Sequence, residues 1–229
     1  MDAMAKPRKP MIVRFERKEH VGRLGDQMHQ YYRCKRFAEE CGAGYQSQPW
    51  VGDKVFKLPA YAEGEPTVVL NGNEHFLTKP YDRDQAREWF QIHDRFKYCP
   101  YPHPFTVIHL RRGDLFVPGD HAPMFGIREF RQFCDRNQID FSRCVIVSDD
   151  FPFQHYWEDP LTKTLGRCEL ELGYMIDFYI LTQADRLIGG MSGFAWWGGM
   201  LGHGQCYLPC NITNEHGFGR CDFHLVTFV

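Results

Sequence analysis

The sequence predicts an α/β protein with two lobes, each built around a mostly parallel sheet. Short apolar runs rich in β-branched residues alternate with segments of helical periodicity, which is typical of parallel strands joined by helices. A proline-rich break at residues 98–104 divides a less regular first half from a more regular second half. We therefore expect a basic tail (residues 1–10), an N-terminal lobe (11–104) and a C-terminal lobe (105–229).

The expected elements of the N-terminal lobe rest on short apolar runs, helical spacing and stop signals. Apolar residues recur at helical spacing after a glycine-containing loop, and Gly42 is a typical stop signal for that helix. The expected strands are residues 11–15 and 67–70, and the expected helices are residues 28–41 and 82 to about 97.

The C-terminal lobe alternates strands and helices more regularly, which predicts a parallel sheet covered on both faces. The expected strands are residues 105–110, 144–147, 186–189 and 205–208. The expected helices are residues 126–137, a helix near Phe153, residues 172–184 and residues 194–201.

Composition narrows the class of protein. The 229 residues are enough for a buried core, and 43% hydrophobic with 24% charged residues is typical of a globular protein. The net charge of −2 argues against broad nucleic-acid binding, which needs excess positive charge. A local cationic pocket remains compatible with this balance.

The cysteines and the apolar runs bear on the compartment. Nine scattered cysteines without a CxxC pair predict neither a disulfide framework nor a zinc site, so we expect free thiols in a reducing compartment. The sequence contains neither a secretory signal nor the ~20 apolar residues of a membrane span. These observations predict a cytoplasmic protein.

The segment HLRRGD, residues 109–114, is the strongest candidate for a binding motif. It ends an expected parallel strand, and ligands bind outside the carboxyl ends of such strands. Arg111 and Arg112 could each give a phosphate two aligned charge-assisted hydrogen bonds, while Gly113 permits close approach. The alternative is an exposed turn whose arginines pair with surface acids.

Three further loops follow expected strands. The loop GRLGDQ, residues 22–27, precedes a helix whose N-terminus favours an anion, although a simple tight turn is the alternative. In VSDD, residues 147–150, the carboxylates could bind a base or a sugar hydroxyl, or cap a helix. In GGMSGFAWWGG, residues 189–199, Ser192 could cap a helix or donate to a phosphate, and both tryptophans are interpreted as core residues.

Two other readings are disfavoured. Asp82-Arg83-Asp84 has the form of a metal-binding DxD, but Gln85 lies three positions after Asp82, as in a helix cap. No other carboxylate cluster has metal-ligand spacing, so no metal or other cofactor is expected. The chain lacks a P-loop and a GxSxG elbow, which argues against nucleotide hydrolases and serine hydrolases.

In this order, the motifs resemble those of a known family. Residues 22–28, 109–114, 147–150 and 177–198 look like the motif series of α1,2-fucosyltransferases, and residues 177–189 (DFYILTQADRLIG) also resemble protein O-fucosyltransferases. The resemblance implies an inverting, metal-independent glycosyltransferase of GT-B architecture, with two Rossmann-like lobes and a cleft between them. Its implied partners are a GDP-fucose donor and a glycan acceptor.

The resemblance also implies roles for particular residues. Arg111 or Arg112 would hold the β-phosphate with help from Ser192, and Asp114 would brace the arginines. His109 and Asp149 or Asp150 would contact the nucleoside, and Gly25 and Gln27 would form the floor of the cleft. The expected donor site comprises Gly25, Gln27, His109, Arg111, Arg112, Asp114, Ser148, Asp149, Asp150, Ser192, Gly193 and Phe194.

The chain departs from the family at Asp26, where the family has asparagine, and at residues 192–197, which have fewer serines. We interpret Asp26, with Arg111 and Arg112, as catalytic, with Asp26 as the base. An Asp26–Arg23 ion pair is the structural alternative, and Glu16 and Glu19 are the next candidates for the base. Two other functions stay open: transfer of rhamnose or xylose from UDP or GDP, and a non-catalytic nucleotide-sugar-binding module.

Overall fold

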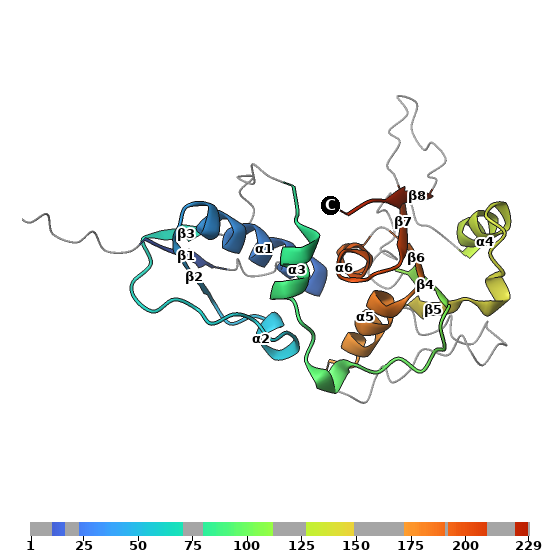
Figure 1. The fold of residues 1–229 in the computed structure, drawn as a ribbon, viewed down its shortest axis with the longest axis horizontal. Helices are drawn as coiled ribbons and strands as arrows, with labels where there is room; N and C mark the ends of the chain where they lie inside the picture. The colour runs from blue at the N-terminus through green and yellow to red at the C-terminus, as the bar shows by residue number, and fades with distance from the viewer. Residues whose placement is uncertain are drawn as a thin grey trace, which may run out of the picture.

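The structure is a computed structural model that describes residues 11–16, 23–70, 80–111, 127–148, 172–190, 192–209 and 223–228. It is a mixed α/β protein with two separate sheets, both mostly parallel (Figure 1). The α/β class predicted from the alternation of elements is therefore confirmed. The tail at residues 1–10 and the helix expected near Phe153 lie outside the described residues.

The first sheet has three parallel strands: β1 (Ile12–Phe15), β2 (Gly44–Ser47) and β3 (Val68–Leu70). Their order is β2-β1-β3, so β1 is the central strand. Val13 and Phe15 of β1 are completely buried, as their apolar, β-branched run predicts. The strand β2 was not predicted from its sequence.

Helix α1 (Leu24–Glu40) follows β1 and covers this sheet, and its buried side includes Met28, Tyr31 and Tyr32. Short helix α2 (Gly52–Val55) was also not predicted. Helix α3 is Arg83–Trp89, so the prediction of one helix reaching Lys97 is wrong. The chain leaves the helix because Ile92 forms a β-bridge with Phe56, and it then makes only a 3₁₀ turn, Asp94–Phe96.

The second sheet has the order β5-β4-β6-β7-β8. Its first four strands are parallel, and the edge strand β8 is antiparallel to β7. The strands are β4 (Thr106–Leu110), β5 (Val145–Ser148), β6 (Arg186–Gly189), β7 (Gln205–Pro209) and β8 (Phe223–Val226). The predictions for β4 to β7 are confirmed to within about a residue, and β8 was missed.

Helices cover both faces of this sheet, as the alternation of strands and helices predicts (Figure 1). Alternate residues of β4 point to opposite faces. Ile108 and Leu110 pack with α4 (Ile127–Arg136), whereas Val107 packs with α5 (Tyr174–Gln183). His109 alternates with Ile108 and so shares the α5 face, which directs it toward the site described below.

Helix α6 (Gly193–Leu201) connects the two halves of the chain. It lies between α1, α3 and α5, and its fully buried Trp197 belongs to the same core cluster as Val13 of the first sheet (Figure 1). The Trp197 Nε1–H donates to the Gly25 carbonyl oxygen at 3.1 Å. Arg83 of α3 donates to the carbonyls of Gly199 (3.3 Å) and Gly202 at the other end of α6.

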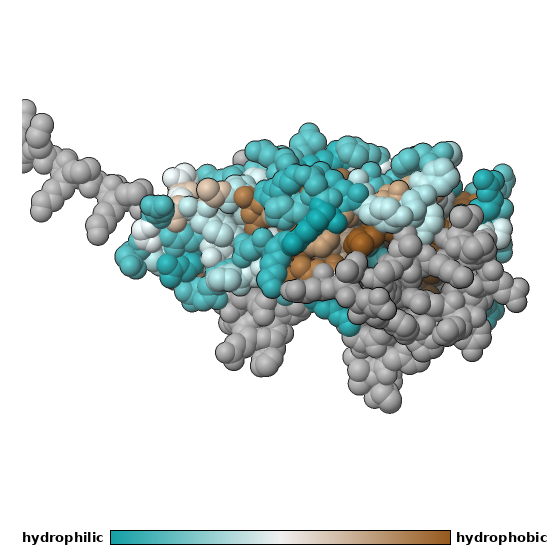
Figure 2. Space-filling model, turned by 90° about the horizontal axis from the view of Figure 1, so that it is seen from below, coloured by the Kyte–Doolittle hydropathy of each residue, from teal (hydrophilic) through white to brown (hydrophobic). Residues whose placement is uncertain are grey.

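The visible face in Figure 2 is largely hydrophilic, and its hydrophobic residues show mainly in the middle of the molecule. Within the residues that the structure describes, no helix combines the length and the apolar character needed to cross a membrane.

Candidate functional site

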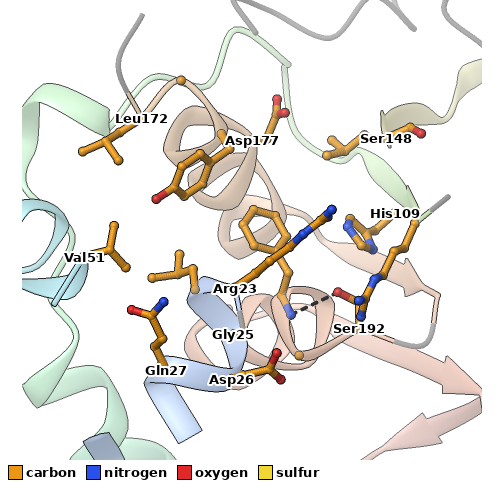
Figure 3. A pocket seen from close by; sticks show the side chains of 17 residues that line it. Arg23, Gly25, Asp26, Gln27, Val51, His109, Ser148, Leu172, Asp177 and Ser192 are labelled. Carbon is orange, nitrogen blue, oxygen red and sulfur yellow. Dashed lines mark hydrogen bonds between the residues drawn. The ribbon is translucent and has the colours of Figure 1, made fainter. Parts of the chain in front are cut away.

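The strand order places a site at the carboxyl ends of β1 and β4. In each sheet the strand that comes first in the chain, β1 or β4, has the next two strands on opposite sides of it, and ligands bind at such switch points. A cavity of about 590 Å³ lies there (Figure 3). It is lined by Arg23, Leu24, Gly25, Asp26, Gln27, Val51, His109, Arg111, Val147, Ser148, Leu172, Gly173, Tyr174, Asp177, Ser192, Gly193 and Phe194.

Two helix N-termini meet at the floor of this cavity. A Cβ added to Gly25 would lie 2.5 Å from the Gly193 carbonyl carbon and 2.6 Å from the Phe194 nitrogen. Only glycine therefore allows α1 to begin directly against the start of α6. Because both termini carry partial positive charge and backbone N–H groups, this corner of the cavity favours a negatively charged ligand.

Ser192 is the N-cap of α6, which confirms one of its two predicted roles. Its Oγ accepts a hydrogen bond from the Phe194 N–H at 3.1 Å (Figure 3). A serine hydroxyl that accepts in this way keeps its own proton for donation. Since Ser192 also lines the cavity, its role as a donor to a ligand is compatible with the cap.

Two arginines reach the cavity from different parts of the fold. Arg111 follows β4, and Arg23 is the N-cap residue of α1. Figure 3 shows the Arg23 side chain extending toward His109. Both arginines thus contribute positive charge to the cavity, and guanidinium groups suit phosphate oxygens because they can bind two at once.

The deeper end of the cavity is polar but buried. His109 is 6% exposed, Ser148 is 6% exposed and Asp177 of α5 is 5% exposed. The His109 ring lies 5.5 Å from the Phe194 ring, centroid to centroid. Buried polar groups of this kind can discriminate between ligands, because a ligand group that does not match them in hydrogen bonding is desolvated without compensation.

Asp177 was not predicted as a site residue. Its helix, YMIDFYILTQ, is otherwise almost entirely apolar. Acidic residues are almost never fully buried without a partner, so a single carboxylate in such a helix is a signal that could have identified it. The structure places Asp177 in the wall of the cavity beside the end of β5 (Figure 3).

Asp26 and Gln27 both line the cavity, as predicted. Gln27 is buried, whereas Asp26 is exposed and its carboxylate points toward the start of α6 (Figure 3). The Asp26 Oδ1 lies 3.5 Å from the position that a Cβ on Gly193 would occupy. Arg23 extends in another direction, so this arrangement does not favour the Asp26–Arg23 ion pair that we considered as the alternative.

The structure therefore brings together Gly25, Asp26, Gln27, His109, Arg111, Ser148, Ser192, Gly193 and Phe194, all of which were predicted from separate motifs. Four other predicted site residues lie outside the described residues: Arg112, Asp114, Asp149 and Asp150.

The cap interpretation of Asp82 is confirmed, because its Oδ1 accepts from the Gln85 N–H at 2.9 Å. Gln85 does not complete a reciprocal box, since its side chain contacts Tyr32, Arg36 and Glu39 instead. Among the described residues, no group of three or more His, Cys, Asp or Glu side chains could hold a metal ion.

Comparison with models of known protein families gives no match, and comparison with curated proteins gives no significant match.

Proposed function

We propose that this protein is an inverting glycosyltransferase that transfers a sugar from a nucleotide donor to a glycan hydroxyl, with GDP-fucose as the first candidate donor. The observation that carries this proposal is the convergence of Arg23, Arg111 and two helix N-termini on one cavity. Positive charge concentrated in one corner of a larger, partly apolar cavity suits a diphosphate attached to a nucleoside.

The diphosphate end of the donor would occupy the corner beside Arg111 and Ser192. Negative charge builds on the departing diphosphate during transfer, and preorganised donors stabilise that charge. Arg23 would reach the same group from the first sheet, so the donor would be bound between both halves of the chain. This is the arrangement expected of a GT-B enzyme, in which two Rossmann-like lobes close on the donor.

The nucleoside would occupy the buried polar end, beside His109, Ser148 and Asp177. These side chains offer both donors and acceptors in a desolvated environment, as recognition of one particular base requires. Guanine presents donors on its Watson–Crick edge, which suits a buried carboxylate such as Asp177. Discrimination between GDP and UDP is therefore assigned to this end of the cavity.

The reaction would use Asp26 as the base. The acceptor oxygen attacks C1 of the sugar, and the bond between C1 and the β-phosphate oxygen breaks. The bonding electron pair leaves with the nucleoside diphosphate, and the acceptor proton passes to the Asp26 carboxylate. Asp26 suits this role because it is accessible and stands beside the corner assigned to the diphosphate.

Thermal unfolding with GDP, UDP and dTDP tests the binding step. A nucleotide at one hundred times its Kd adds ~2.7 kcal/mol of stability, and we expect GDP to give the largest shift, without added metal. The matching nucleotide sugars are then assayed for release of nucleoside diphosphate. If UDP gives the largest shift, the donor is a UDP-sugar and not GDP-fucose. Nucleotide binding without turnover would indicate a non-catalytic binding module. Absence of nucleotide binding would refute the proposal.

A further inference from the structure

A second cavity, of about 500 Å³, lies behind the corner assigned to the diphosphate. Its near wall is shared with the first cavity and consists of Arg111, Ser192 and Gly193. Its remaining lining residues are His29, Arg33, Tyr81, Gly190, Trp196, Leu208 and Pro209. A molecule in this cavity would therefore meet a donor in the first cavity at the shared wall.

Helix α1 connects the two cavities along one face. Asp26, His29 and Arg33 are spaced by three and four residues, so they lie on the same side of the helix. Asp26 lines the first cavity, and His29 and Arg33 line the second. The carboxylate that we assign as the base thus lies on the path between the two.

The second cavity has a preorganised aromatic wall. The His29 ring lies 4.8 Å from the Trp196 ring and 5.5 Å from the Tyr81 ring, and Tyr81 lies 4.9 Å from Trp196, all between centroids. Trp196 is only partly buried and lines the cavity. A broad aromatic surface of this kind packs well against the C–H face of a pyranose ring.

Hydrogen bonds fix the polar groups of this wall. The Tyr81 hydroxyl accepts from Arg33 Nε–H at 3.0 Å and lies 3.0 Å from His29 Nδ1. Burial, with a smaller contribution from Arg33, lowers the pKa of His29 to about 4, so this histidine is neutral at physiological pH. The Nδ1 of a neutral His29 can accept a hydrogen bond from the Tyr81 hydroxyl, which orients both rings.

The charged side chains that line the second cavity are all positive among the residues that the structure describes. Its described lining residues include two arginines and no carboxylate. Arg33 uses Nε–H for Tyr81, and among the described residues no hydrogen bond or ion pair involves its two terminal nitrogens. Those nitrogens can bind both oxygens of one carboxylate, which is the geometry that guanidinium groups favour.

We propose that the second cavity is the acceptor subsite, and that it takes a uronic acid: a pyranose ring against Trp196 with its carboxylate bound by Arg33. The proposal rests on the proposed function, since it requires a donor in the first cavity. A ring held in this way can present a hydroxyl at the shared wall, toward Asp26 and Arg111. The substrate class of the enzyme is then an acidic glycan.

Direct binding tests the subsite without relying on turnover. Methyl glucuronide and methyl glucoside are compared by tryptophan fluorescence and by saturation-transfer NMR. A charge-assisted hydrogen bond contributes ~1.5–3 kcal/mol, so we expect the glucuronide to bind ~10- to 100-fold more tightly. Arg33→Met should remove this preference and Arg33→Lys should keep part of it. The matched control is Arg36→Met, on the same helix but outside both cavities.

Equal affinity for the two glycosides, or binding of neither, would overturn the proposal, as would an unchanged preference in Arg33→Met. Inorganic sulfate is the competitor that isolates charge: if it displaces the glucuronide with equal affinity, the cavity is an anion site without a sugar subsite. GDP is titrated into the same variants. Nucleotide binding without glucuronide preference refutes only this inference, whereas absent nucleotide binding refutes the proposed function.

Discussion

The two cavities share a wall, yet they differ in burial and in charge. The first contains buried side chains that include both hydrogen-bond donors and acceptors, with Asp177 and His109 at its deep end. The second is lined by partly buried aromatic rings and arginines, and no carboxylate is among the lining residues that the structure describes. The first suits a ligand recognised by a detailed pattern of hydrogen bonds, and the second suits a ligand recognised by a ring face and a negative charge.

This difference arises from one helix. The first turn of α1 carries Gly25 and Asp26 against the start of α6, whereas its second and third turns carry His29 and Arg33 against the Trp196 side of α6. The register of α1 on α6 therefore decides which side chains enter each cavity.

The largest effect is expected for Asp26→Asn, which removes the carboxylate between the cavities. If Asp26 is the base, kcat should fall ~10²- to 10⁴-fold. Affinity for the nucleotide should stay the same or improve, because a negative charge near the diphosphate is lost. Steady-state kinetics and nucleotide titration measure these two quantities separately.

Asp84→Asn is the matched control, because its side chain is 97% exposed on α3 and lines neither cavity. It should leave kcat unchanged. Unchanged turnover in Asp26→Asn would exclude Asp26 as the base and make Glu16, after β1, the next residue to test.

Arg111→Met removes the charge from the shared wall and should affect both cavities. Loss of one preorganised donor to developing charge costs ~3–4 kcal/mol, or roughly 10²- to 10³-fold in kcat. Nucleotide affinity should weaken as well, because in the proposed complex the same guanidinium also binds the ground-state diphosphate. The control Arg143→Met changes an exposed arginine outside both cavities. Equal kinetics in the two variants would exclude Arg111 from the donor site.

Much of the first cavity could be predicted from the sequence because its residues follow strands. A parallel strand is recognisable from its apolar run, and the carboxyl ends of such strands share an edge. His109, Ser148 and Ser192 were predicted in this way, and the structure brings them together. Asp177 lies inside helix α5 instead, so it could not be predicted from its position at the end of a strand.

The second cavity could not be predicted because no local pattern encodes it. His29 and Tyr81 are far apart in the sequence, and their contact depends on how α1, α3 and α6 pack. The two tryptophans were interpreted as core residues, which is correct for the fully buried Trp197. Trp196 also packs against that core, but it is only partly buried and lines the second cavity as well. The prediction of where α3 ends was wrong for a similar reason, because the Phe56–Ile92 bridge is a long-range contact.

The neutral state of His29 in the second cavity predicts a pH dependence of stability. Its pKa is about 4 in the folded protein against 6.5 for an ordinary histidine, because the ring is buried and, to a smaller extent, because Arg33 is close. The unfolded chain therefore binds the proton more readily. Stability should fall as pH decreases from about 6.5 to about 4, by on the order of 3 kcal/mol.

Urea unfolding across this pH range measures the effect, and His29→Phe should flatten the curve while keeping an aromatic ring between Tyr81 and Trp196. The equivalent change at His224, which is exposed on β8, should leave the pH dependence as it is. If His29→Phe has the same slope as the unsubstituted protein, then another group titrates and His29 is not held neutral.

The smallest effect is expected at the junction itself, where the two glycines should respond unequally to alanine. A methyl group on Gly25 would meet the Gly193 and Phe194 backbone at 2.5 to 2.6 Å, whereas one on Gly193 would meet Gly25 at 3.3 Å. Overpacking costs ~1–3 kcal/mol, and we expect Gly25→Ala to fall in that range and Gly193→Ala to cost less. Urea midpoints rank the two variants. Backbone atoms cannot move aside as a side chain can. Equal midpoints would therefore mean that α1 does not start directly against α6. The wall that the two cavities share would then not be formed by this contact.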